Sequence, residues 1–489
     1  MNRAKTLGEL KKSGYQVLPV KDELRKNLIE KIRKKESLFP GVVGYDKTVI
    51  PQLVNALLSK HDFILLGLRG QAKTRILRAL PGFLDEYIPI IKGCPINDNP
   101  YDPVCVPCKK KLASQKDDLE IEWINREQRF QEKLATPDIT IADLIGDIDP
   151  IKAAREKLDF SDEQVIHYGI IPRVNRGIFA INELPDLQPR IQVGLLNIME
   201  EKDFQIRGFP IRIPLDILIV YSANPEDYTN RGNIITPLKD RIDSQIITHY
   251  PQSLDDAIKI TEQEAWLDRG LKIHIPHFFK EIIEEVAFVA RKSEFVDQSS
   301  GVSARLPISS LENLISNIEK RGLITGEKEL YPRICDLIAV IPSVTGKIEL
   351  VYEGEQEGHN IIAVNLVGRA IKEVFGKYFP DAKKNPTNLP TAREDNQYGD
   401  ILRYFSAGKT LELSDESTFE EYFNTLSKIP GLKKMAEKHT SPGSKEELAA
   451  TMELVLEGLH QNNLIGKETF ENAFRYTDML ATMLRGMED

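Results

Sequence analysis

The chain has 489 residues, 41% of them hydrophobic, and carries a formal net charge of −9 at pH 7. This length and composition suffice to bury a large core, and we expect roughly two to four domains. The acidic balance makes nucleic acid an unexpected partner. No run of about eighteen apolar residues occurs and the segment after Met1 is polar, so the sequence predicts neither membrane insertion nor export but a cytoplasmic protein.

The N-terminal segment is predicted to form a helical extension of the core. Residues 1–38 are rich in lysine and glutamate, and Leu24, Leu28 and Ile32 recur at the spacing of an amphipathic helix. A second helix is indicated over residues 49–58. The core is therefore expected to begin near residue 39.

The most informative stretch is GLRGQAKT, residues 67–74, which follows the apolar run FILL and precedes RILRAL. A buried strand, a glycine-containing turn, Lys-Thr and a helix form the arrangement that surrounds nucleotide phosphates. Backbone N–H groups face the anion, Lys73 bridges the β- and γ-phosphates, and the Thr74 hydroxyl ligates Mg²⁺. The sequence therefore predicts that ATP and Mg²⁺ bind here. The residues expected to line this site are Gly67, Gly70, Gln71, Ala72, Lys73 and Thr74.

One position departs from the usual phosphate-loop pattern. Ala72 stands where a glycine usually precedes the lysine. The added methyl group is compatible with helical backbone dihedrals, and we expect helical dihedrals at Ala72. The sequence therefore predicts a weakened phosphate loop rather than an abolished one.

Two further apolar runs, residues 177–181 and 216–221, are predicted strands, and a helix over residues 191–199 lies between them. Strands that alternate with helices indicate a parallel α/β sheet, whose ligand lies beyond the carboxyl ends of the strands. We expect this α/β core to span residues 39–250. Two insertions are expected within it: a Cys-containing segment at 93–135, with a charged helix over residues 117–134, and a second segment at about 140–172.

Polar side chains follow both of these strands. Glu183 is placed to orient or deprotonate the water that attacks the γ-phosphate, an effect on the order of 10²–10⁴ in rate. Asn182 stands where an aspartate usually holds the water shell of Mg²⁺, so we expect weaker magnesium binding and slower hydrolysis. Asn224 is placed to bond the attacking water or the γ-phosphate. The alternatives are a loop that merely follows a strand at Asn182-Glu183 and an Asn-Pro turn at Asn224.

Two arginines are candidates for contacts with the phosphates. Arg241 lies at the end of a predicted helix, from which it could reach across a subunit boundary and stabilise charge on the γ-phosphate. The alternative is a surface salt bridge to Asp240 or Asp243. Arg305 opens a helix of the second half and could close onto the same phosphates as part of a lid, the alternative being a solvated arginine.

From residue 251 onward the pattern is mainly helical. Residues 251–380 are expected to form a helical lid with a short β element, because the alternating residues 347–352 indicate a strand or hairpin. Residues 381–489 are expected to form a linker and a helical C-terminal domain, in which Ser444 and Glu447 suggest a capping box. The helices predicted in the lid cover residues 275–291, 306–320 and 361–378.

Three of the four cysteines lie in the first insertion. Cys94, Cys105 and Cys108 have the spacing C-x₁₀-C-x₂-C, and a C-x₂-C pair is half of many zinc sites. The candidates for a fourth ligand to Zn²⁺ are Asp98, Asp102, Cys335 and His167. The alternative is a set of reduced thiols on the solvent side.

In their order along the chain, these segments resemble the AAA+ ATPases of the magnesium-chelatase subunit I and MoxR type over roughly residues 36–375. The matching blocks are FPGVVGY at 39–45, residues 67–74, GCP at 93–95, GDIDPIKA at 146–153, NRGIFAINE at 175–183, SANPE at 222–226, PLKDRID at 237–243 and GVSAR at 301–305.

The resemblance implies roles for the candidate site residues. Lys73 and Thr74 take the Walker A positions, and Asn182 and Glu183 the Walker B positions. Asn224 matches sensor 1, Arg241 the arginine finger and Arg305 sensor 2. The segment near residue 147 resembles the helix 2 insert, a hairpin that projects into the ring.

The resemblance also implies a fold and an activity. It implies an AAA+ P-loop core followed by a helical lid, and a hexameric ring of identical chains that hydrolyses ATP between subunits to remodel a partner, commonly one with a von Willebrand A domain. Residues beyond about 380 match nothing in the family. Two alternatives remain: a scaffold that assembles on ATP with little hydrolysis, and a nucleic-acid or transcription-linked regulator, which the acidic charge disfavours.

Overall fold

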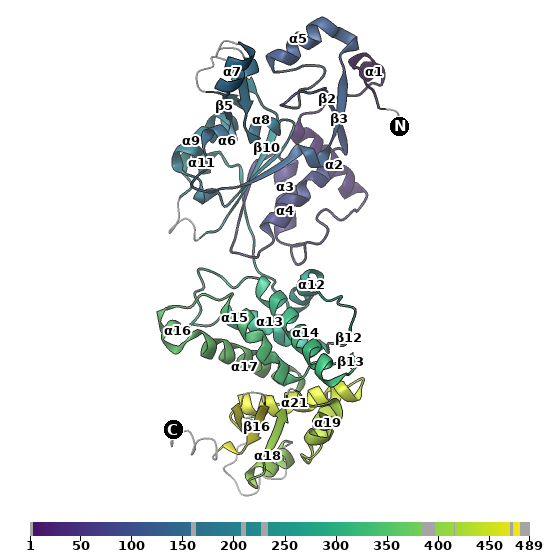
Figure 1. The fold of residues 1–489 in the computed structure, drawn as a ribbon, viewed down its shortest axis with the longest axis vertical. Coiled ribbons are helices and arrows are strands. Elements are labelled where there is room, and N and C mark those ends of the chain that lie inside the picture. Colours follow the sequence, from purple (N-terminus) through teal and green to yellow (C-terminus); the bar gives the residue numbers. More distant parts are fainter. Residues whose placement is uncertain are drawn as a thin grey trace. The chain divides into compact units, whose positions relative to one another are not determined.

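The computed structural model describes residues 3–157, 163–206, 212–225, 233–382, 397–414, 416–469 and 473–479. The chain divides into two compact units, residues 1–249 and 250–489 (Figure 1). Each unit is described by itself below. No helix within the described ranges is both long enough and apolar enough to cross a membrane.

The first unit is built on a five-stranded sheet whose neighbouring strands are all parallel. Its strands, in spatial order, are β11 (Ser244–Ile247), β1 (Phe63–Leu66), β10 (Ile217–Ala223), β7 (Gly177–Asn182) and β4 (Phe130–Leu134). Parallel strands require crossover connections, and helices supply them on both faces of the sheet. The result is the α/β architecture expected from the alternating pattern.

Alternate residues of the strands enter two separate hydrophobic cores. Phe63 and Leu65 of β1 belong to the core under α2, α3 and α4, whereas Ile64 and Leu66 belong to the core under α9 and α11. This alternation follows from the two-residue period of a strand. The covering helices are α2 (Val20–Arg33), α3 (Val49–Leu58), α4 (Lys73–Ala79), α9 (Pro189–Glu200) and α11 (Thr236–Arg241).

The prediction of a charged helix over residues 117–134 is wrong. That segment instead forms β3 (Ile121–Asn125), a 3₁₀ turn and β4. β3 pairs with β2 (Tyr87–Ile91), and β4 pairs with β7 at the edge of the main sheet. Charged residues are typical of edge strands, because they oppose pairing with another chain. They are equally typical of a solvent-exposed helix, and for this reason the sequence pattern was interpreted as a helix.

The remaining elements of the first unit lie outside the main sheet. The helix-2-like insert forms an antiparallel pair, β5 with β6, that carries α7. These elements are α1 (Leu7–Lys12), α5 (Val106–Gln115), α6 (Ile141–Leu144), β5 (Gly146–Ile148), α7 (Pro150–Glu156), β6 (Ile166–Tyr168), α8 (Ile170–Arg173), β8 (Asp203–Gln205) and β9 (Arg212–Pro214).

The second unit is mainly helical and has one continuous hydrophobic core that extends from α13 to β16. Its first part contains α12 (Leu254–Glu264), β12 (Lys272–Ile273), α13 (His277–Ala290), α14 (Arg305–Thr325), β13 (Glu329–Leu330), α15 (Ile341–Thr345), α16 (Tyr352–Glu357) and α17 (His359–Tyr378). Its second part contains α18 (Gly399–Ser406), β14 (Leu411–Ser414), α19 (Phe419–Leu426), α20 (Leu432–Thr440), α21 (Lys445–Gln461), β15 (Gly466–Thr469) and β16 (Ala473–Thr477).

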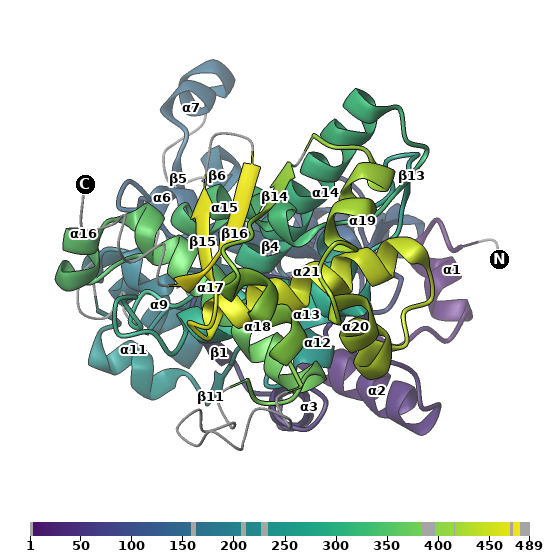
Figure 2. The same ribbon diagram turned by 90° about the horizontal axis from the view of Figure 1, so that it is seen from below.

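α21 is the central helix of this unit, with α17, α19 and α20 packed against it (Figure 2). Every residue from 448 to 459 is buried, including Glu453 and Glu457. Both carboxylates are satisfied: Glu453 accepts from the Tyr422 hydroxyl at 2.6 Å, and Glu457 pairs with Lys467 at 2.8 Å. Buried charges persist only with such partners.

Two local expectations for the second unit are corrected. Residues 347–352 form no strand: Leu350 makes a single β-bridge to Val296, and α16 begins at Tyr352. The box at Ser444 is half formed, since the Ser444 hydroxyl accepts from the backbone N–H of Glu447, whereas the Glu447 carboxylate accepts from Gly443. The short β element of this part is instead the pairing of β12 with β13.

Candidate nucleotide-binding site

The predicted phosphate loop connects β1 to α4, as the sequence pattern indicates. Gly67 is required by close packing, because a Cβ atom there would collide with Thr248 Oγ1 and Gln71 Oε1. Gly70 has φ of +75°, which a side chain would strain. Side-chain packing therefore explains Gly67, and the backbone conformation of the loop explains Gly70.

Ala72 does not have the helical dihedrals that we expected. Its φ is +56° and its ψ is +14°, in the left-handed region. A Cβ atom makes this region unfavourable by about 1–2 kcal/mol, which explains why glycine usually fills the position. The phosphate loop therefore contains backbone strain at Ala72, which the sequence analysis did not predict.

Replacing Ala72 with glycine is expected to raise stability and ATP affinity together, by up to about 1 kcal/mol. The strain disappears, and a methyl group makes no hydrogen bond that could be lost. Thermal unfolding and ATP titration of the full chain measure both effects. Ala79→Gly, at the right-handed end of α4, is the matched control and should destabilise by about 0.5–1 kcal/mol.

Lys73 and Thr74 begin α4. The Lys73 side chain is buried, and its ammonium donates to the carbonyl oxygens of Gly67 and Leu68, the latter at 3.1 Å. Thr74 is exposed. The ammonium is therefore held over the loop by weak carbonyl acceptors, which an incoming anion can replace.

Three residues that support the loop were not among the predicted site residues. The Tyr45 hydroxyl lies 2.9 Å from Gln71 O and 2.7 Å from His249 O. Thr248, which follows β11, donates to Gln71 Oε1 at 2.7 Å. Tyr45 is the last residue of the FPGVVGY block, and that motif was the one sequence signal that could have pointed to it. No sequence signal pointed to Thr248 or His249, because their contacts with the loop depend on strand pairing.

The ends of the three central strands lie at one edge of the sheet. Leu66 pairs with Ala223, and Tyr221 pairs with Ile181, so the residues that follow these strands are neighbours. The backbone N–H of Gly67 also donates to Ala223 O at 3.2 Å. The structure thereby brings the phosphate loop, Asn224 and the Asn182-Glu183 pair to the same edge.

Ser222 connects the two polar strand ends. Its hydroxyl donates to Asn182 Oδ1 at 3.0 Å and accepts from the backbone N–H of Glu183 at 3.4 Å. Asn224 is buried, and its Oδ1 atom has no hydrogen-bond partner among the described residues. A buried, unsatisfied amide oxygen is rare and typical of a site that binds a ligand or a water molecule.

Glu183 occupies a strained position at the end of β7. Its φ is +55° and its ψ is +52°, again left-handed. The turn separates Glu183 from the strand direction and starts the 3₁₀ segment Leu184–Asp186. Strain of this kind at a non-glycine residue costs on the order of 1–3 kcal/mol and is concentrated at functional sites.

The two arginines lie in different units. Arg241 ends α11 and pairs with Glu200 of α9, with 2.9 Å between Nε and Oε2, so its partner is neither Asp240 nor Asp243. Arg305 begins α14 in the second unit and is exposed. The contacts of either arginine with nucleotide stay predictions.

The cysteine prediction is partly resolved. Cys94, Cys105 and Cys108 converge with Asp98, and all four residues are buried, so solvent-side thiols are excluded. Burial is the main reason why the pKa of the Asp98 carboxyl is raised to about 6, and the nearby Cys94 is the second. The other candidate ligands are not members of this cluster: Asp102 and His167 are exposed, and Cys335 is buried within the second unit.

No protein-family model matches the chain. Over 209 residues it is 29% identical to a magnesium-chelatase subunit ChlI homolog of Methanocaldococcus jannaschii, covering 40% of this chain and 52% of that protein. Over 169 residues it is 27% identical to an archaeal Lon protease of Thermococcus kodakarensis, covering 30% of this chain and 25% of that protein. The chain thus spans about half and about a quarter of these two relatives.

The solved structures that the chain matches include a chain in a cryo-EM-based complex of the magnesium chelatase subunits BchI and BchD. The similarity covers 65% of this chain and 98% of that chain, at 16% identity and a TM-score of 0.35.

The parallel five-stranded sheet, its helices on both faces and the loop from Gly67 to Thr74 at its edge make up an α/β unit with the AAA+ fold. Over the matched residues the chain resembles the AAA+ ATPases of the magnesium-chelatase subunit I and MoxR type.

Proposed function

We propose that the chain binds ATP with Mg²⁺ and hydrolyses it slowly, as a ring-forming AAA+ motor that remodels a protein partner. The observation that carries this proposal is the meeting of three strand ends at one sheet edge. Through the pairings Leu66 with Ala223 and Tyr221 with Ile181, the phosphate loop lies beside Asn224 and Glu183. These groups are the ones that hold a triphosphate and its attacking water.

Each residue has a distinct role in this proposal. Lys73 moves its ammonium from loop carbonyls to the β- and γ-phosphates, and the Thr74 hydroxyl ligates Mg²⁺. Glu183 orients the water and accepts its proton. Asn224 offers its unsatisfied amide oxygen to the same water. Asn182 contributes no negative charge, so magnesium is held less firmly than by an aspartate.

The ring and its partner rest on the family resemblance. Arg241 serves as the arginine finger toward the next subunit of a hexamer, for which it exchanges Glu200 for the γ-phosphate. By the same resemblance, Arg305 is the proposed sensor 2 residue. A von Willebrand A domain protein is the proposed partner.

A second candidate is an assembly scaffold that binds ATP and scarcely hydrolyses it. Ser222 favours this reading, because its hydroxyl occupies the Asn182 oxygen that would otherwise hold the water shell of Mg²⁺. Steady-state phosphate release separates the two: turnover that exceeds the protein-free control supports the motor, and ATP binding without turnover supports the scaffold.

Nucleotide binding is tested with Lys73→Met in the full chain. Loss of the ammonium should weaken ATP binding about 10–100-fold, since a charged hydrogen bond contributes about 1.5–3 kcal/mol. ATP binding is measured by titration calorimetry with Mg²⁺ present. Lys34→Met, which removes an exposed lysine paired with Glu30 on α2, is the control and should leave the affinity unchanged. Equal affinity for both variants contradicts the proposed site.

A further inference from the structure

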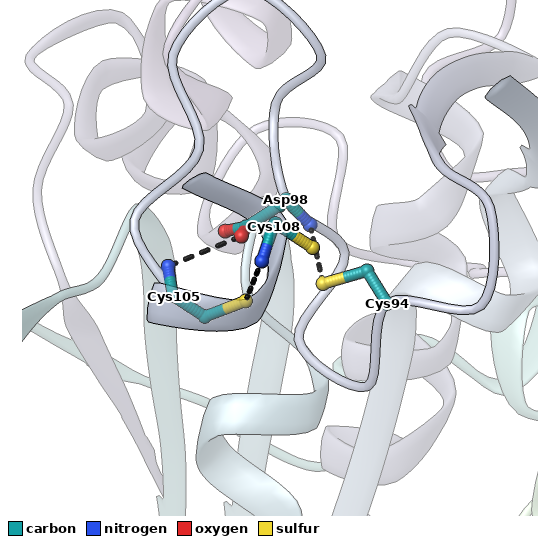
Figure 3. Close-up of side chains that lie close together, drawn as sticks. All are labelled: Cys94, Asp98, Cys105 and Cys108. Carbon is teal, nitrogen blue, oxygen red and sulfur yellow. Dashed lines mark hydrogen bonds between the residues drawn. The ribbon is translucent and has the colours of Figure 1, made fainter. Parts of the chain in front are cut away.

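The three cysteines and one aspartate of the first insertion form a cluster that the nucleotide site does not use. Cys94, Asp98, Cys105 and Cys108 each offer one ligand atom, and these atoms all lie within 4.8 Å of one another. Figure 3 shows the four side chains converging from the loop after β2 and from the start of α5. We propose that they hold one zinc ion with tetrahedral coordination, three ligands being thiolates and the fourth the Asp98 carboxylate.

The spacing of the ligand atoms fits a single ion. Zinc–sulfur bonds of about 2.3 Å place sulfur atoms about 3.8 Å apart in a tetrahedron, so closure requires movements of no more than about 1 Å. Iron–sulfur clusters also use cysteine ligands, but the cluster of iron and sulfide must fit between them. Ligand atoms as close as these surround one ion instead.

The backbone already orients the ligands. The backbone N–H of Cys108 donates to Cys105 Sγ, and that of Asp98 donates to Cys94 Sγ, both at 3.4 Å. Such bonds stabilise thiolates without occupying them fully. The site is therefore organised by the turns of the chain, and the ion needs little rearrangement to bind.

The Asp98 carboxylate is the second indication of a cation. It is 0% exposed, and its two oxygen atoms accept from the backbone N–H groups of Val104 and Cys105, both at 3.1 Å. Each oxygen atom retains a lone pair that can bind a metal ion, and the three cysteine sulfur atoms are the other ligand atoms of the cluster. A buried carboxylate is costly unless a cation or further donors compensate it, and a divalent ion does so.

The donor set favours zinc over other metals. Thiolates select zinc, copper(I) or iron–sulfur chemistry, whereas a carboxylate oxygen disfavours copper(I). Four buried protein ligands leave no open coordination position, which is the pattern of a structural zinc site.

The position of the cluster indicates what the ion does. Asn97 Nδ2 donates to Arg173 O at 2.8 Å, Asn175 Nδ2 donates to Ile96 O at 3.0 Å, and Arg176 Nη1 donates to Pro89 O at 2.8 Å. Residues 173–176 immediately precede β7, whose opposite end carries Glu183. Zinc would therefore fasten the insertion to the amino end of β7, away from the nucleotide edge.

Metal content of the full chain tests the proposal independently of ATP. Protein purified without chelators should contain about one zinc per chain by elemental mass spectrometry. Cys94→Ser and Cys108→Ser should each lose most of it. Cys335→Ser is the matched control, because Cys335 is equally buried but lies in the second unit, and it should retain the full zinc content.

Cobalt(II) keeps the test decisive if the serine variants fold poorly. The metal-free wild-type chain, reduced, should take up one Co²⁺ and show thiolate-to-cobalt charge transfer with tetrahedral d–d bands, both displaced by Zn²⁺. Asp98→Cys should still bind and should intensify the charge-transfer band, since a fourth thiolate replaces the carboxylate.

Several results would overturn the zinc site. These are a wild-type chain without zinc that also takes up no Co²⁺, iron with inorganic sulfide in place of zinc, a native disulfide between two of the three cysteines, or full zinc content in the Cys94→Ser/Cys108→Ser double variant. A zinc-loaded chain that fails to bind ATP would instead count against the proposed function alone.

Discussion

Glu183→Gln is expected to slow phosphate release by roughly 10²–10⁴-fold while ATP binding persists. Glutamine keeps the size of the side chain and can still bond a water molecule, but it cannot accept the proton of that water. The left-handed turn at Glu183 and the bond from its backbone N–H to Ser222 hold the residue at the edge beside the phosphate loop. Both features remain when only the carboxylate changes, so the loss should fall on the chemical step.

Phosphate release under saturating ATP measures this effect, with ATP titration of the same variant as the companion readout. Glu201→Gln is the control, because Glu201 is exposed at the end of α9 and should leave the rate unchanged. Phosphate release by Glu183→Gln at the wild-type rate would remove Glu183 from the proposed mechanism. An equal loss in ATP affinity would indicate a structural role instead.

Arg129→Leu is expected to lower the free energy of unfolding of the first unit by about 3–5 kcal/mol. Arg129 is 1% exposed and forms a bidentate pair with Glu23, with distances of 2.7 and 2.6 Å. Its Nε also donates to Arg176 O at 2.8 Å. Without the guanidinium, the Glu23 carboxylate stays buried and still accepts from the backbone N–H of Asp85. The pair thus fixes α2 to the start of β4.

Urea unfolding followed by Trp123 fluorescence measures this loss. The second tryptophan, Trp266, lies in the other unit and is replaced by phenylalanine in all variants, so that the signal reports the first unit. Arg78→Leu is the matched control: Arg78 pairs with Glu132 of β4, but its side chain is 62% exposed, and the expected cost is about 1 kcal/mol or less.

A double variant separates the buried charge from the lost packing. Glu23→Leu combined with Arg129→Leu should recover part of the stability, because no uncompensated charge remains in the core. If Arg129→Leu costs no more than Arg78→Leu, the buried pair does not have the structural importance inferred here.

The sequence was sufficient for the parts of the fold that local pattern controls. The apolar run before Gly67 and the lysine and threonine after it were enough to predict β1, the phosphate loop and α4. The polar residues after residues 177–181 and 216–221 predicted that strand ends would meet at one edge. These features can be recognised from the sequence alone, because strand periodicity and phosphate binding depend on residues that are neighbours in the chain.

The sequence pattern did not identify the charged edge strand β4. β4 was mistaken for a helix because its solvent-facing charges match a helix surface as well as a strand edge, and pairing with β7 decides between them. The left-handed backbone of Ala72 was missed for a related reason. Its dihedrals are imposed by the loop around it rather than by its own preference.

By itself, the sequence determined the fold class, the order of its motifs and the residue types present in the loop from Gly67 to Thr74. Only the tertiary structure decided which residues support that loop, such as Tyr45 and Thr248, and which aspartate joins the three cysteines. The physical reason is that hydrogen bonds and metal ligands act over a few ångströms in space. The chain places the partners of such contacts up to about two hundred residues apart, as with Tyr45 and His249.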